Sequence, residues 1–387
     1  MKYLSGLTLA LIFSSIVNVY GQEEDEKKSL LISSSFTIDN VFNLTGGIEK
    51  GSSTLGLFDF SILYTPFKSS IFQKTRFHIH LLKTGGKGPS ENFIGDAQVA
   101  SNIEGKSSRF LYEALVIQQF GNICLSFGLH DLNTEFMMSE YAGDFINSSF
   151  GIFPAVSLNV PVSIFPVTSV GGILCYHKNS FGFAAGLYNL NNDYLEEEEF
   201  NFQNHLYQKG YLAVAEISYH LESDNNLTGE YKLGGYFKDC SPGEEFTEDE
   251  CTLKNENYGI YGIADQSIVS IGSNFQLGIF AQIGLSPKKT NYVPDYYGAG
   301  ISIHTNDKKY APEFVGLAFG TVGLNSYSAE MGYYNPVRET AIELSAKKTL
   351  FEKLTLQPDL QYIISPSGIY ENALVGILRL QVELNNE

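Results

Sequence analysis

The sequence predicts an all-β fold, a transmembrane antiparallel β-barrel of about 16 strands. The polarity of the 387 residues alternates with a period of two along most of the chain. The alternating segments are roughly ten residues long, which suits a tilted strand that crosses a membrane. Aromatic residues are abundant, with 24 Tyr and 28 Phe, whereas only 18% of the residues are charged.

The first 21 residues are expected to be a secretory signal peptide. Lys2 precedes an apolar stretch from Leu4 to Val17, and Gly21 provides a small residue for cleavage. The alternative is a transmembrane anchor, but Ser14 and Ser15 interrupt the stretch. We expect an acidic N-terminal segment over 22–35 and no later run of about 18 apolar residues, so an exported chain that stays in a membrane must cross it with strands.

The barrel is expected over residues 36–387, and the stretch 76–81 is an early strand with two clearly different faces. One face carries Phe77, Ile79 and Leu81, and the other carries Arg76, His78 and His80. A soluble sandwich or barrel would also alternate, but its strands are nearer five or six residues. The longer segments and the export signal favour the transmembrane barrel, with its apolar face on lipid and its polar face on the lumen.

The alternation is lost between Asp131 and Pro166. This stretch contains Pro154 and Pro161, and its content of Phe, Met and Ile is too high for a disordered connection. A long connection of this kind is usually functional. We expect 131–166 to be a loop that folds into the barrel and narrows it; the alternative is a cap outside one barrel mouth.

The second half of the chain holds the clearest hairpin. Residues 211–222 and 227–238 both alternate, and the polar turn 223–226 separates them. Residues 275–285 and the last segment, 374–384, repeat the pattern. Long strands joined by tight turns, each with one apolar face, predict a closed barrel.

Two acidic stretches, 191–204 and 239–257, are expected to be solvated extracellular loops. Cys240 and Cys251 bracket the acidic part of the second and are candidates for a disulfide. Cys124 and Cys175 lie in separate apolar segments as core or lipid-facing thiols. Four cysteines allow three pairings, and the sequence does not choose among them.

Charge and motifs exclude several functions. The net charge of −18 argues against nucleic acid as a partner, because such binding needs a basic surface. The chain contains no G-x-S-x-G motif, phosphate-binding loop or dinucleotide fingerprint, so we expect neither an enzyme nor a cofactor. His78 and His80 share a strand face, but no third ligand is evident in the sequence, and we expect no metal site.

Several short stretches carry specific sequence motifs. The most specific is Leu-Gln-Pro-Asp-Leu-Gln-Tyr, residues 356–362, before the last strand. Others are 43–47, 95–98, 101–104, 111–114, 128–136, 145–151, 163–168, 265–266 and 372–374. Together these stretches resemble the carbohydrate-selective porins of Gram-negative outer membranes. The chain departs from the family in having no Trp and in ending on Glu387 rather than on an aromatic residue. Tyr and Phe are therefore the only aromatic platforms for a sugar ring.

The resemblance implies a 16-stranded barrel in the outer membrane that passes small saccharides by facilitated diffusion, as a monomer or a homotrimer in contact with outer-membrane lipid. A neutral sugar is recognised by planar bidentate groups and aromatic surfaces, and Arg suits its diols better than Lys does. The candidate pore-lining residues are Arg76, Arg109, Glu113, Asp131, Asn133, Glu135 and Asn147. The alternatives are a cation-leaning porin without sugar selectivity and a plugged structural or adhesive barrel.

Overall fold

The computed structural model of the chain describes residues 29–66, 75–105, 111–190, 210–222, 227–239, 256–271, 274–288, 291–305, 311–328, 333–351 and 353–385. The strands of the first half are β1 (Leu30–Gly47), β2 (Gly51–Tyr64), β3 (Thr75–Gly86), β4 (Leu111–Phe120), β5 (Ile123–His130), β6 (Ser169–Lys178), β7 (Phe181–Asn189) and β8 (Tyr211–Glu222). Those of the second half are β9 (Thr228–Asp239), β10 (Glu256–Ile271), β11 (Phe275–Leu285), β12 (Asp295–Thr305), β13 (Phe314–Ser328), β14 (Tyr333–Leu350), β15 (Leu354–Ile364) and β16 (Glu371–Asn385).

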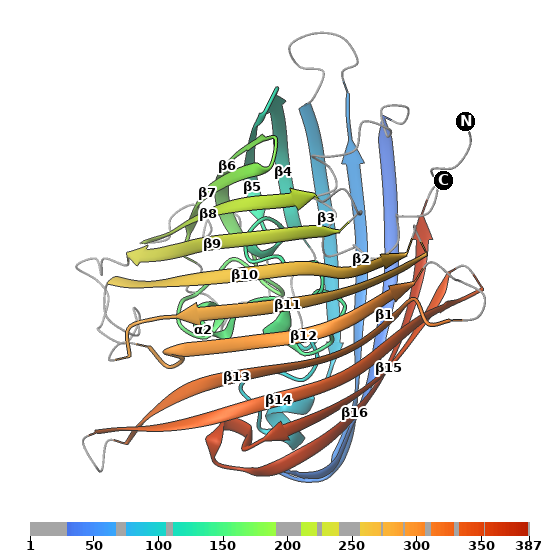
Figure 1. The fold of residues 1–387 in the computed structure, drawn as a ribbon, viewed down its shortest axis with the longest axis vertical. Coiled ribbons are helices and arrows are strands. Elements are labelled where there is room, and N and C mark those ends of the chain that lie inside the picture. The colour runs from blue at the N-terminus through green and yellow to red at the C-terminus, as the bar shows by residue number, and fades with distance from the viewer. Residues whose placement is uncertain are drawn as a thin grey trace.

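These strands close into one antiparallel barrel in which each strand pairs with its neighbours in sequence and β1 pairs with β16 (Figure 1). The closing seam runs from the pair Ser33 and Asn385 to the pair Gly47 and Glu371. Closure leaves no strand edge exposed, as a membrane-spanning sheet requires. The predicted closed barrel of 16 strands is therefore confirmed.

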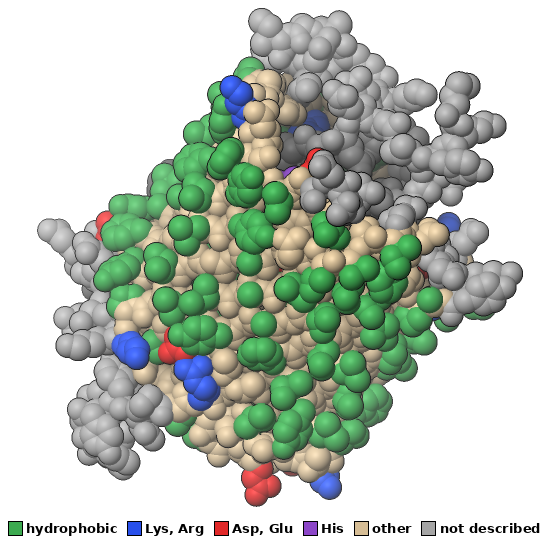
Figure 2. Space-filling model, viewed as in Figure 1, with side chains coloured by type: hydrophobic (Ala, Val, Ile, Leu, Met, Phe, Trp, Pro, Cys, Tyr) green, Lys and Arg blue, Asp and Glu red, His purple; other side chains and the backbone are tan. Residues whose placement is uncertain are grey.

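The outer surface of the barrel is apolar. Exposed side chains along the strands include Phe127, Leu187, Ile217, Leu233, Ile260, Leu317 and Leu344. In Figure 2 hydrophobic side chains spread over the strands seen in that view, whereas most charged ones lie near its margins. This is the pattern expected where strands meet lipid. No helix among the described residues is long and apolar enough to span a membrane.

The bounds of several strands agree closely with those expected from the sequence. The segment expected at 275–285 is β11, and 211–222 and 227–238 correspond to β8 and β9. The alternation of β8 is as predicted, with Leu212, Val214 and Glu216 buried and Ile217 exposed. β1 begins at Leu30, earlier than the expected barrel start at Phe36. Residues 1–28, with the expected signal peptide, lie outside the described residues.

Two connections pack against the inner face of the barrel, which is the face opposite the exposed apolar residues. The first, residues 87–105, contains the short helix η2 (Ser90–Ile94). The second, residues 131–168, contains η3 (Leu132–Thr134), η4 (Ser148–Phe150) and α2 (Pro154–Ser157). A last turn, η5 (Pro366–Gly368), joins β15 to β16. Backbone polar groups of both connections are buried against this face, and side chains of the strands supply partners for several of them.

Candidate functional site: the inner wall of the barrel

The inner face of β2, β3 and β4 carries a group of charged and imidazole side chains. Alternation along β3 directs Arg76, His78 and His80 to this face, since Phe77 and Ile79 between them are exposed on the outside. In the strand register His80 lies opposite Glu113 on β4. His80 Nε2 lies 2.7 Å from Asp59 Oδ2 on β2, and His80 Nδ1 lies 3.3 Å from Glu113 Oε2.

Glu113 also connects this wall to the long inner connection. The backbone N–H of Asp131 donates to Glu113 Oε1 over 3.0 Å. The Tyr112 hydroxyl donates to Asp131 Oδ2 over 2.5 Å, and Asp131 Oδ1 caps η3 by accepting from Asn133 N. Burial, followed by the nearby Glu113 carboxylate, raises the pKa of Asp131 to about 7. The start of the connection is thus fixed to β4 by buried hydrogen bonds.

Carboxylates on other strands hold the rest of the connection 131–168. Asp265 on β10 accepts from Ser139 Oγ at 2.6 Å and from Glu140 N at 3.1 Å. Glu343 on β14 accepts from Ile146 N at 2.6 Å and from Asn147 N at 2.9 Å. Both carboxylates are buried. Buried donors left without partners are costly, so these bonds fix the connection against the wall.

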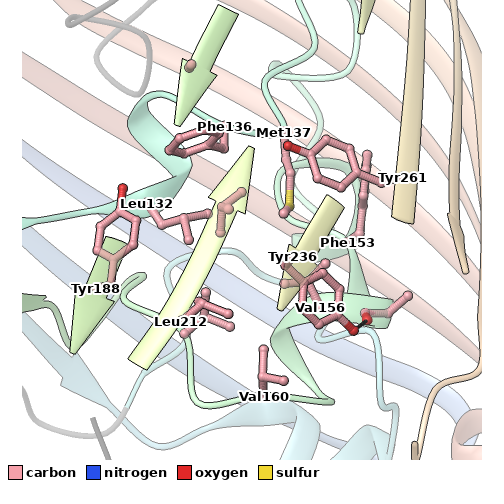
Figure 3. Packing of buried hydrophobic residues seen from close by; sticks show 14 of the residues in the cluster. Leu132, Phe136, Met137, Phe153, Val156, Val160, Tyr188, Leu212, Tyr236 and Tyr261 are labelled. Atoms are coloured by element: carbon pink, nitrogen blue, oxygen red, sulfur yellow. Dashed lines mark hydrogen bonds between the residues drawn. The ribbon is translucent and has the colours of Figure 1, made fainter. Parts of the chain in front are cut away.

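Apolar packing reinforces these bonds. Figure 3 shows Phe136, Met137, Phe153 and other side chains of the connection pointing toward aromatic residues of the strands. Phe153 stacks on Tyr296 with 5.5 Å between ring centroids and meets Tyr261 edge-on at 5.6 Å. Tyr261 in turn donates its hydroxyl to Glu216, which also accepts from Met137 N. This part of the barrel interior is filled by side chains.

The shorter connection 87–105 is anchored in the same way. Glu339 on β14 accepts from Ala97 N at 2.8 Å and from Gln98 N at 2.9 Å. Arg379 on β16 makes two 2.8 Å hydrogen bonds to Asp39 on β1 and a 2.7 Å bond to Asn102. Glu339 on β14 and the Arg379–Asp39 pair across the β1–β16 seam therefore hold the connection 87–105 against the inner wall.

The model of one protein family, described as "Carbohydrate-selective porin, OprB family", matches residues 70–384. The match covers most of the chain, including the strands and the two inner connections after residue 70. The chain belongs to this family. Most of the short stretches that suggested the resemblance lie within residues 70–384. Two of them contain residues that anchor the long connection, Asn147 and Asp265.

A curated relative and two solved structures are among the proteins that this chain is similar to. Porin B of Pseudomonas aeruginosa is 24% identical over 207 residues, which are 45% of this chain and 45% of that protein. The chain thus aligns with less than half the length of this curated relative. The high-pH structure of Pseudomonas putida OprB has a TM-score of 0.74 at 19% identity, covering 92% of this chain and 94% of that one. Its low-pH structure has a TM-score of 0.58 at 17% identity, covering 92% and 93%. These structures share the fold.

The structure brings some of the sequence-predicted pore residues of this OprB-family chain together. Glu113 and Asp131 are joined by a hydrogen bond, whereas Arg76 lies farther along the β3–β4 wall, opposite Ile117. Asn133 donates to the carbonyls of Phe136 and Gly151 within that connection. Asn147 is fully buried and donates to Gln361 Oε1 over 3.1 Å. Arg109 lies outside the described residues.

Two of the four cysteines lie within the described residues, and two lie outside them. Cys240 and Cys251, the candidate disulfide, lie outside the described residues, as does the acidic run 196–199. Cys124 and Cys175 are directly opposed in the β5–β6 register, and both are buried thiols that are not joined in a disulfide. Cys175 Sγ donates to Glu135 over 3.1 Å, and burial raises the pKa of this carboxyl to about 7. The sequence left open whether these thiols are in the core or face lipid, and the structure places both in the core.

Sequence reasoning missed the inner carboxylates that hold the connections. Asp39, Glu216, Glu339 and Glu343 each stand at a polar position of an alternating strand, where they look like ordinary lumen residues. Their partners lie far away in sequence: Glu343 is 197 residues from Ile146, and Glu339 is 242 residues from Ala97. A single sequence carries no signal for such pairs beyond the polar face itself.

Proposed function

We propose that the chain is a passive channel through which small saccharides diffuse across the outer membrane. Membership of the carbohydrate-selective porin family supports this proposal. The barrel has the apolar outside of a membrane protein and a polar inner wall on β2–β4. Because the proposed constriction is formed within one chain, the proposal holds for a monomer and for a homotrimer.

The proposed constriction is the connection 131–166. The observation that carries the proposal is the set of hydrogen bonds from its backbone to carboxylates of the inner wall, made by Glu113, Glu216, Asp265 and Glu343 on four different strands. A segment held from several sides leaves a fixed and narrower path than an empty barrel of this size. Fixed polar walls at close range are how channels select among solutes.

The sugar-contacting residues are proposed to lie on the wall of β3 and β4. Arg76 lies on the inner face of β3 opposite Ile117, and its planar guanidinium is the proposed donor to a pair of sugar hydroxyls. Glu113 lies four positions along the wall, opposite His80, and is proposed to act from there. The acidic stretches 191–204 and 239–257, most of which lie outside the described residues, are proposed to disfavour anions through their negative charge. The competing functions are a cation-leaning pore and a plugged barrel, and one measurement distinguishes them from the proposed function.

That measurement is the conductance of single channels of the purified protein in planar bilayers, with and without glucose or maltose. The proposal predicts a steady conductance that falls as sugar is added, because a sugar in the constriction displaces ions. A conductance indifferent to both sugars would identify a general pore and refute the saccharide assignment. A protein that is folded and inserted but electrically silent would refute the channel itself.

Arg76→Ala tests the proposed sugar contact. The variant should retain its conductance and lose much of the sugar block, because the guanidinium on the inner face is gone. Arg338→Ala is the matched control, since Arg338 side-chain exposure is 47% and its ion-pair partner is Asp295 on β12. Equal sugar block in the two variants would remove Arg76 from the site.

A further inference from the structure

Three side chains on the β3–β4 wall present potential metal ligands to one another. His78, His80 and Glu113 each offer one ligand atom, and all of these atoms lie within 4.8 Å of one another. His80 Nδ1 is 3.3 Å and His78 Nδ1 is 3.7 Å from the same oxygen, Glu113 Oε2. His78 Nδ1 has no hydrogen-bond partner among the described residues. Two imidazole nitrogens therefore converge on one carboxylate oxygen.

The strand geometry makes this convergence specific. His78 and His80 are separated by one residue on β3 and so share a face, and Glu113 lies directly opposite His80 on β4. The two rings are 5.8 Å apart between centroids and inclined at 38°. Ligands about 2.0–2.1 Å from a tetrahedral zinc ion lie roughly 3.3 Å from one another. The two nitrogen-to-oxygen distances are close to this value, so small side-chain rotations are sufficient to place all three around one ion.

The surrounding groups orient these ligands as the second shell of a metal site does. His80 Nε2 lies 2.7 Å from Asp59 Oδ2, the arrangement in which a carboxylate fixes the tautomer of a metal-bound histidine. Glu113 Oε1 accepts from the backbone N–H of Asp131, which leaves Oε2 facing the two histidines. The His78 and His80 side chains keep 11% and 14% of their surface exposed, so a fourth position remains for water.

We propose that His78, His80 and Glu113 form a Zn²⁺ site on the inner wall of the barrel, with Asp59 and the Asp131 backbone as its supporting shell. Neutral imidazole and carboxylate ligands suit Zn²⁺, whereas Mg²⁺ and Ca²⁺ prefer sites made of oxygen ligands alone. Three protein ligands with one open position are a common zinc arrangement. The site goes beyond the proposed saccharide channel, although it shares Glu113 with the proposed sugar-contacting wall.

The test is isothermal titration calorimetry of ZnCl₂ into the full chain, purified in detergent and stripped with a chelator. The wild type should bind one Zn²⁺ at this site, with MgCl₂ and CaCl₂ giving no heat of binding there. His78→Gln and His80→Gln should each lose this site. Asp59→Asn should keep it with an affinity weakened roughly 10–100-fold, the usual effect of removing a carboxylate that orients a metal-bound histidine.

His304→Gln is the matched control. His304 also faces a carboxylate, with its Nδ1 3.6 Å from Asp144 Oδ2, but that pair is not part of the described His–His–Glu cluster. Its titration should equal that of the wild type, and resistance to unfolding in detergent should show that each variant is folded. Zinc binding that is absent from the wild type, or unchanged in both folded His78 and His80 variants, would overturn the proposal. Neither result depends on sugar transport, so the saccharide proposal stands or falls separately.

Discussion

Two regions of the inner wall use charged residues in opposite ways. On β2–β4, Asp59, His78, His80 and Glu113 contact one another across neighbouring strands. On β8, β10 and β14, Glu216, Asp265 and Glu343 instead accept hydrogen bonds from the backbone of the connection 131–168. In the first region polar side chains pair with one another. In the second region polar side chains are fixed attachments for the connection 131–168.

A polar residue on the inner face of a strand therefore has one of two roles, either to anchor a connection or to form part of the β2–β4 wall. An attached carboxylate contributes to the shape of the channel through buried hydrogen bonds, so its loss should act on stability and on channel width. A side chain of the β2–β4 wall should act on what the channel binds. Glu113 belongs to both regions, because one oxygen faces the histidines and the other accepts from Asp131 N.

Asp265→Ala should have the largest effect and tests whether attachment is structural. The variant leaves Ser139 Oγ and the backbone N–H groups of Glu140 and Tyr141 without their acceptor. Each buried donor left unpaired costs about 1–3 kcal/mol. The free energy of unfolding in urea should fall accordingly, whereas Glu222→Ala, on a side chain that is 78% exposed, should change little. Equal stability of the two variants would mean that the carboxylate does not hold the segment.

Gly278→Ala tests how the connection 131–168 packs on the strands rather than how its polar groups are attached. A Cβ at Gly278 on β11 would lie 2.1 Å from the Tyr141 ring of the connection, whereas a Cβ at Gly85 would meet no atom within 4 Å. Overpacking of this kind costs about 1–3 kcal/mol. Thermal unfolding should therefore occur at a lower temperature for Gly278→Ala than for Gly85→Ala. The same melting temperature in both would show that the ring moves freely aside.

Asp96→Asn tests a buried carboxyl in the connection 87–105, and its effect should depend on pH. Burial, and then the carboxylate of Glu339, raise the pKa of Asp96 from 3.8 to about 8. The folded state therefore binds more protons than the unfolded state between these values, and wild-type stability falls as the pH rises through this window.

The Asn variant cannot ionise, so it should gain in melting temperature over the wild type as the pH is raised from about 4 to about 8. Glu91→Gln, in the exposed first turn of η2, is the control. If the difference in melting temperature between the wild type and Asp96→Asn stays constant with pH, the pKa of Asp96 is not raised on folding.

The barrel was largely predictable from the sequence because a strand that faces lipid on one side must alternate. β11 has the predicted bounds, and the break after Asp131 was visible because a segment packed on the inner wall is freed from this alternation. The expected start of the barrel at Phe36 misses the first residues of β1, from Leu30 to Ser35. The residues from Leu30 to Ser35 include three consecutive serines, which give no apolar alternation although they pair with β2 and β16.

The site was less predictable, because it depends on register and on distant contacts. The sequence placed His78 and His80 on one face, but the third group, Glu113, comes into reach only through the pairing of β3 with β4. The connection 87–105 was not recognised as an inner segment, since its attachment to Glu339 joins residues more than 200 positions apart. Local patterns predict strands and their faces, and tertiary pairing decides which polar residues meet.

The connection 131–166 is proposed to set the width of a sugar channel, and the single-channel conductance of the double variant Asp265→Ala/Glu343→Ala is the direct test. This double variant removes the acceptors of residues 139–141 and 146–147 in the connection. For protein that remains folded and inserted, the account predicts a larger conductance than that of the wild type and a weaker block by glucose. Wild-type conductance with an unchanged glucose block would contradict it.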